Sequence, residues 1–85
     1  MERMLTVRIL TPGGTEFEAR AQSVILPGAD GSFGVMYGHA EMIAALAEGK
    51  AVLKSAEGRT ERSIGGGIAH IKDNTVTVFT DKAAS

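Results

Sequence analysis

The sequence predicts an all-β domain, a sandwich or barrel of short antiparallel strands. Apolar and polar residues alternate in several short runs, most clearly in Thr-Val-Thr-Val-Phe-Thr at 75–80. Turn-forming residues recur about every 8–12 positions, a spacing typical of such folds. No segment carries a sustained apolar period of 3.6 residues, as a helix packed on a core would.

Length and composition limit the chain to one domain, residues 1–85. A mass of 8.9 kDa allows only one hydrophobic core, and 44% hydrophobic residues are typical of a globular protein. The formal charge is −1 without a basic stripe, which argues against nucleic-acid binding. The absence of cysteine excludes disulfides, thiolate metal sites and a cysteine nucleophile. The longest apolar run, 42–47, is too short to span a membrane.

The expected strands are separated by glycine, proline and polar turns. Pro27 and Gly28 are expected to end the third strand, and residues 56–59 to form a hairpin tip. Residues 42–48 could form a helical turn, but Gly38 and Gly49 limit the segment to strand length. The expected strands cover residues 5–10, 15–22, 23–26, 42–48, 50–55, 60–64, 68–71 and 75–80.

The stretch 26–46 is the candidate functional region, because it joins glycine-rich turns to an apolar run. Loops normally lie at the surface, so its apolar side chains are either tucked under the domain or offered to another molecule. Phe33, Met36, Tyr37 and Met42 together favour a protein-binding patch. Core filling is the alternative for each methionine.

Two glycine-containing motifs have chemical-site alternatives. Gly65–Gly67 could cradle a phosphate, but the Lys-Ser/Thr pair of a P-loop is missing, which favours a strand bend. Asp30 and Gly31 lack the alternating oxygen ligands of a calcium loop and predict a turn.

The two histidines are the only general-base candidates near neutral pH. A triad could be drawn from Ser32, His39 and Asp30, but no nucleophile elbow is present. His39 is expected to hold its loop by hydrogen bonds or to lie in a protein interface, and His70 to lie at the surface or a sheet edge. We therefore expect no catalytic, metal-binding or cofactor-binding residues.

The glycine-rich stretch resembles the signature of a known family. Leu26-Pro27-Gly28, Asp30-Gly31, Phe33-Gly34 and Gly38-His39-Ala40 are similar to the signature of the epsilon subunit of F-type ATP synthase, called delta in mitochondria. Thr11-Pro12-Gly13, Gly65-Gly66-Gly67 and Asn74-Thr75-Val76-Thr77-Val78 agree with it too. The resemblance covers essentially all 85 residues in the right order.

The resemblance implies a sandwich of about ten short antiparallel strands in two sheets. It also implies a non-catalytic rotor subunit of the central stalk, which links the gamma subunit to the membrane c-ring. The complex couples proton translocation to ATP synthesis, with sodium as the alternative ion, and its ATP chemistry lies on the beta subunits. The subunit would sit peripherally on the cytoplasmic face of the bacterial inner membrane, without inserting into it.

The resemblance also assigns contacts by position. The residues implied to meet the c-ring are Gly28, Ala29, Asp30, Gly31, Ser32 and Phe33. Those implied to meet gamma are Thr11, Met36, Tyr37, His39, Met42, Ile43 and Ala44.

The chain departs from the family pattern in two respects. Tyr37 and Glu41 replace the usual prolines, so the loop loses two rigid φ angles and gains a charge near the expected gamma contact. The family's C-terminal helical hairpin would begin at residues 81–85, so its inhibitory arm and ATP site are not expected in this chain. The alternative function is a stand-alone ligand-binding or regulatory module that uses the Gly65–Gly67 bend. An enzyme is the third possibility.

Overall fold

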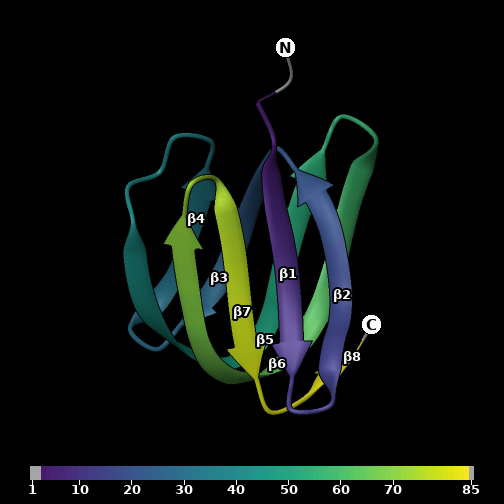
Figure 1. Cartoon of the computed structure of the whole chain (residues 1–85), viewed down its shortest axis with the longest axis vertical. Coiled ribbons are helices and arrows are strands. Elements are labelled where there is room, and N and C mark those ends of the chain that lie inside the picture. The colour runs from purple at the N-terminus through teal and green to yellow at the C-terminus, as the bar shows by residue number, and fades with distance from the viewer. Residues whose placement is uncertain (1–2, 85) are drawn as a thin grey trace.

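A computed structural model describes residues 3–84 as eight β-strands (Figure 1). The strands are β1 (Leu5–Thr11), β2 (Gly14–Ala21), β3 (Ser23–Gly28), β4 (Gly31–Met36), β5 (Met42–Ser55), β6 (Gly58–Lys72), β7 (Thr75–Thr80) and β8 (Ala83–Ala84). The described residues contain no helix, and so none long and apolar enough to cross a membrane. The all-β prediction is confirmed, including a strand rather than a helical turn at 42–48.

Hydrogen bonds join the eight strands into one sheet, in the order β2-β1-β7-β6-β5-β3-β4, with β8 paired to β6. The expected arrangement of about ten strands in two sheets is not confirmed. The expectation that all strands are antiparallel is wrong for β1 and β7, which pair in parallel from Thr6↔Thr75 to Leu10↔Phe79. These strands lie far apart in the sequence, so no hairpin turn fixes their relative direction.

The observed strands divide the chain differently from the expected ones, because two strands are unusually long and because β4 and β8 were not among the expected strands. β5 has 14 residues and β6 has 15, and both continue through glycines that the sequence suggested as breaks. β5 joins the expected strands 42–48 and 50–55 through Gly49, and β6 joins 60–64 and 68–71 through Gly65–Gly67. The expected hairpin between them is confirmed, since the two strands pair down to Ser55↔Gly58.

The glycine run in β6 is a bend, as the sequence predicted. Gly66 and Gly67 have φ angles of 96° and 138°, which side chains of L-residues rarely allow. A β-carbon on Gly67 would also overlap the carbonyl oxygen of Phe79. At this bend β6 changes neighbours, because β7 pairs with residues 67–72 whereas β8 pairs with residues 63–64.

The bent strands fold the sheet into two layers around the core. In Figure 1, β1 and β7 lie in front of β3 and β5, and apolar side chains fill the space between them. The Arg62 guanidinium of β6 lies 4.0 Å from the ring centroid of Phe17 on β2, a cation–π contact between strands that do not pair. The largest fully buried side chains are Leu5, Val7, Ile9, Val24, Leu26, Val35, Ile71, Val76 and Val78.

The Asp73–Asn74 turn follows the sequence prediction, but the expected end of the third strand does not. Asp73 and Asn74 have φ angles of 52° and 60°, as a two-residue hairpin turn requires. The expected strand end at Pro27 and Gly28 is wrong, because both residues pair with β4. Proline lacks an N–H, and the pairing of β3 with β5 is irregular between Ile25 and Gly28.

The bend at Gly65–Gly67 should contribute to the stability of the fold. Replacing Gly67 by alanine should destabilise the fold by about 2–4 kcal/mol, because the new methyl group meets backbone and the φ angle is unfavourable. Gly34→Ala is the matched control, since its β-carbon would meet no atom closer than the Val24 oxygen at 4.0 Å. Urea unfolding followed by circular dichroism measures both; equal midpoints would contradict the structural role of the bend.

Candidate functional site

A row of apolar side chains crosses the outer face of four strands. Backbone pairing aligns Ala45 of β5, Ile68 of β6, Phe79 of β7 and Leu10 of β1 across the sheet. Ile68 is 50% exposed and Phe79 49% exposed, whereas Leu10 is half-buried. We call these four residues the outer apolar row. Exposed apolar side chains that adjoin across a sheet are typical of protein-binding surfaces.

Two of the expected gamma contacts border the outer apolar row. Thr11 shares a hollow of about 410 Å³ with Leu10 and Phe79 at one end of the row. Ile43 is 70% exposed and pairs with His70. This pair lies two residues along β5 and β6 from the pair of Ala45 and Ile68. Thr11 and Ile43 thus lie next to opposite parts of the outer apolar row, although they are far apart in the sequence.

Ile68 and Phe79 are exposed surface residues that were not among the expected contacts. The signal was present in the alternation of β7, where Val76 and Val78 point inward and Phe79 therefore points outward. Ile68 likewise alternates with the buried Ala69 and Ile71. What the sequence could not supply was the pairing that places these two side chains side by side.

The end of β4 and the connection to β5 carry two exposed residues of the expected gamma contact. Met36 is 66% exposed and Tyr37 is 44% exposed. The Arg3 guanidinium carbon lies 5.9 Å from the Tyr37 ring centroid, within cation–π range. The Gly38 N–H donates to the Asn74 side-chain oxygen at 2.7 Å, which ties the connection to the β6–β7 turn.

Both histidines make hydrogen bonds, and in the part of the chain that the structure describes neither is bonded to a serine or aspartate side chain. His39 contacts the Ala40 carbonyl oxygen through Nδ1 at 2.7 Å, and its backbone N–H donates to Met36. Nε2 of His70 lies 3.2 Å from a carboxylate oxygen of Glu41. His39 therefore holds its loop, as expected, and neither Ser32 nor Asp30 contacts it among the bonds described. The expected looseness of the loop stays a prediction.

The expected c-ring contact forms the β3–β4 hairpin. Ala29 and Asp30 form its exposed turn, as the sequence predicted for Asp30, and Ser32 is exposed beyond it. Phe33 instead packs against the core. A β-carbon on Gly28 would lie 2.9 Å from the Phe33 ring, so glycine is needed for this packing.

The fold brings both sets of expected contacts to one hollow. Its volume is about 420 Å³, and its lining combines the β3–β4 hairpin with the start of β5. The lining residues are Gly28, Ala29, Asp30, Gly31, Phe33, Met42, Ile43, Ala44 and Ala45. The expected four-residue patch is nevertheless divided, because Phe33 and Met42 pack against the core while Met36 and Tyr37 are exposed.

The Gly65–Gly67 bend is engaged within the fold. The Gly65 N–H donates to the Lys82 carbonyl and to the Thr80 hydroxyl, both at 3.1 Å. The first N–H of the Gly65–Gly67 run is therefore already bonded within the chain. Among residues 3–84, no group of three histidine, cysteine, aspartate or glutamate side chains could hold a metal ion.

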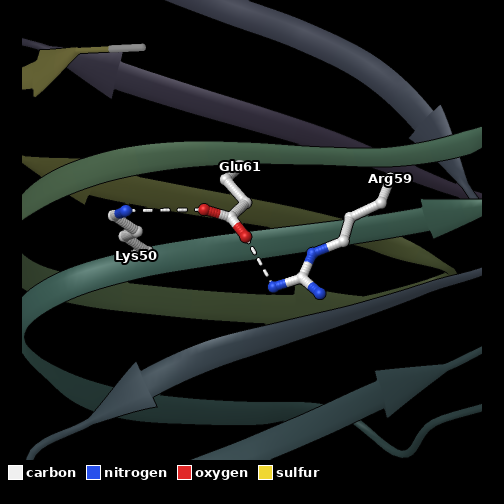
Figure 2. A network of polar contacts seen from close by, with 3 residues as sticks. All are labelled: Lys50, Arg59 and Glu61. Carbon is white, nitrogen blue, oxygen red and sulfur yellow. Dashed lines mark hydrogen bonds and ion pairs between the residues drawn. The ribbon is translucent and has the colours of Figure 1, made fainter.

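The far end of β5 and β6 carries charge instead of apolar side chains (Figure 2). Glu61 forms ion pairs with Arg59 and with the Lys50 ammonium group, the latter at 3.5 Å. The Arg59 hydrogen bond and charge, with a smaller contribution from Lys50, hold the pKa of the Glu61 carboxyl below its ordinary value. The outer surface thus changes from apolar to charged along the length of β5 and β6.

Comparison with known proteins identifies the family. A family profile described as "ATP synthase, Delta/Epsilon chain, beta-sandwich domain" matches residues 4–85. The chain belongs to this family. The ATP synthase epsilon chain of Leptospira borgpetersenii is 32% identical over 80 residues, which cover 94% of this chain and 63% of that protein. The epsilon chain of Synechococcus elongatus is 37% identical over 79 residues, which cover 93% of this chain and 58% of that protein.

Solved structures support the same delta/epsilon fold. A chain in the mitochondrial ATP synthase of Euglena gracilis, solved with OSCP, F1 and the c-ring, superposes with a TM-score of 0.87 at 21% identity, covering 99% of this chain and 54% of that one. A chain of the central stalk and c-ring of the Tetrahymena thermophila mitochondrial enzyme gives 0.75 at 13% identity, covering 96% and 66%. The chain spans about 60% of the length of the epsilon chains that it matches.

The ion pairs of Glu61 should make the stability of the delta/epsilon domain depend on pH. Because the folded state lowers the pKa of Glu61, its contribution to stability is present above the unfolded pKa and is lost as pH falls through the folded pKa. Arg59→Ala should raise this pKa toward its ordinary value more than Lys50→Ala does. Carboxyl-carbon NMR titration of the three proteins measures the difference, and a larger effect of Lys50→Ala would contradict the assignment.

Proposed function

We propose that this chain is a non-catalytic rotor subunit of an F-type ATP synthase, joining the gamma subunit of the central stalk to the membrane c-ring. The outer apolar row is the observation that carries the proposal. Exposed apolar side chains that adjoin on neighbouring strands are typical of a surface that a protein partner covers. Because the chain belongs to the delta/epsilon family, we propose that this partner is another subunit of the ATP synthase stalk.

The outer apolar row and the β4–β5 connection form the proposed gamma contact. Ile68 and Phe79 supply its apolar centre, and Thr11 and Ile43 lie at its borders. Tyr37 adds an exposed aromatic side chain, a residue type enriched among strong interface contacts. This contact buries side chains that already lie in fixed positions on strands, so little conformational entropy is lost on binding.

The exposed turn of the β3–β4 hairpin is the proposed c-ring contact. Ala29, Asp30, Gly31 and Ser32 are exposed there. In this role the folded sheet acts as a rigid coupling, because a rotor subunit must pass torque between two partners without slipping. The chain itself catalyses no reaction in this proposal. It works as a peripheral part of the enzyme on the cytoplasmic face of the membrane, where proton flow is coupled to ATP synthesis.

The outer apolar row gives the main test. Size-exclusion chromatography and calorimetry with the cognate gamma subunit should show a one-to-one complex. Ile68→Ser combined with Phe79→Ser should weaken it by about 2–4 kcal/mol, because both side chains are exposed and lie at the proposed centre. Lys54 pairs with Arg59 at the charged end of β5 and β6, and Lys54→Ser combined with Arg59→Ser should leave binding unchanged. Folded wild-type chain that does not bind gamma at micromolar concentration would overturn the proposal.

The β4–β5 connection gives a second test. Tyr37→Ala and His39→Ala together should weaken gamma binding by about 1–2 kcal/mol, since Tyr37 loses its contact and the loop loses the His39 hydrogen bond. Met42 is left unchanged because it packs against the core, and its truncation would lower stability as well. Full affinity in a variant with an unchanged melting temperature would remove this connection from the proposed contact.

A further inference from the structure

The two open sides of the folded sheet are protected differently. Edge strands normally carry charges or bulges, which prevent another chain from pairing with them. β2 follows this rule, since it carries Glu16, Glu18 and Arg20 and its pairing with β1 shifts after Ile9. On the other side, neither β4 nor residues 42–47 of β5 contain a charged residue. This side is therefore open to strand pairing.

The start of β5 offers unpaired backbone groups on this open side. The Ala29 N–H donates to the Ala45 carbonyl at 2.9 Å, so the Ala45 carbonyl points away from β6. Backbone groups of a strand alternate in direction, so the N–H and C=O of Ile43 point to the same side. β3 ends at Gly28, and no described strand pairs with Met42–Ala44 on that side.

A hollow lies beside the backbone N–H and C=O of Ile43. It is the hollow of about 420 Å³ between the β3–β4 hairpin and the start of β5. Its lining is apolar except for Asp30, which forms no ion pair among residues 3–84. An extended backbone at Ile43 could thus direct one side chain into the hollow while its neighbour lies on the outer face beside Ile43.

We infer that an extended segment of a neighbouring stalk subunit adds to β5 as an extra strand at Ile43. The segment carries an apolar side chain for the hollow and a basic side chain opposite Asp30. Main-chain hydrogen bonds supply affinity in this binding mode, and pockets for alternate side chains supply specificity. The inference rests on the proposed function, since it names how the partner is bound, and the added strand would continue the sheet next to the outer apolar row.

Amide hydrogen exchange of the assembled complex is the first test. In the isolated chain the Ile43 amide should exchange quickly, because it has no partner. In the complex its exchange should slow by about tenfold or more, as expected for an amide in a sheet. The Gly58 amide, at the remote β5–β6 hairpin, should exchange equally in both states. An Ile43 amide that stays unprotected in a formed complex would overturn the inference.

A pair of substitutions separates the backbone from the side chain. Ile43→Pro and Ile43→Ala both remove the exposed isoleucine side chain, but only proline also removes the N–H. Proline is tolerated at a strand edge where the N–H does not pair, so β5 should still pair with β6. The Ile43→Pro variant should bind the gamma subunit about tenfold more weakly than the Ile43→Ala variant does. This difference corresponds to the loss of one hydrogen bond at an interface. Equal affinities would overturn the inference.

The outcomes distinguish this inference from the proposed function. If wild-type chain forms no complex with the gamma subunit or the c-ring, the proposed function fails and the inference fails with it. If a complex forms while Ile43 stays unprotected and both substitutions act equally, the rotor-subunit function stands and only strand addition is excluded. Self-association of the isolated chain that protects the Ile43 amide would assign the edge to a second copy instead, and would likewise overturn the inference.

Discussion

The fold depends on one backbone constraint, the bend at Gly65–Gly67. Positive φ angles at Gly66 and Gly67 turn β6, and its pairing with β5 keeps the same register on both sides of Gly66, so one hydrogen-bonded sheet can enclose its own core. The chain between β7 and β8 crosses the bend at the same point, where the Gly65 N–H bonds to Lys82 and Thr80. Any side chain at Gly67 would collide with the Phe79 backbone, and so would separate β7 from β6.

The bend also divides the surface of the long strands into two unlike parts. On one side of it, β6 pairs with β7 and presents Ile68 beside Phe79. On the other side, the same strand presents Arg59 and Glu61 to solvent. A charged end keeps the domain soluble, and an apolar row is suited to a permanent partner. This division is what a subunit held in a larger assembly by one face would require.

Polar contacts hold the β4–β5 connection. Gly38 bonds to Asn74, and Glu41 lies within hydrogen-bond distance of His70. Asn74 also accepts a hydrogen bond from the Thr6 N–H, so one residue joins the connection, the β6–β7 turn and β1. Side-chain contacts of this kind fix a loop less tightly than proline does, because their geometry depends on rotamers.

The sequence by itself determined the local structure: the all-β class, the Asp73–Asn74 turn, the hairpin tip at 56–59 and the bend at Gly65–Gly67. These features follow from residue type and alternation, which act over a few positions. Its signature residues also determined the family. Only the tertiary structure decided the parallel pairing of β1 with β7, the outward alignment of Ile68 with Phe79, and the hollow shared by Asp30 and Ala44. Each of these joins segments distant in the chain, and alternation along a strand specifies which face a side chain occupies but not which strand lies beside it.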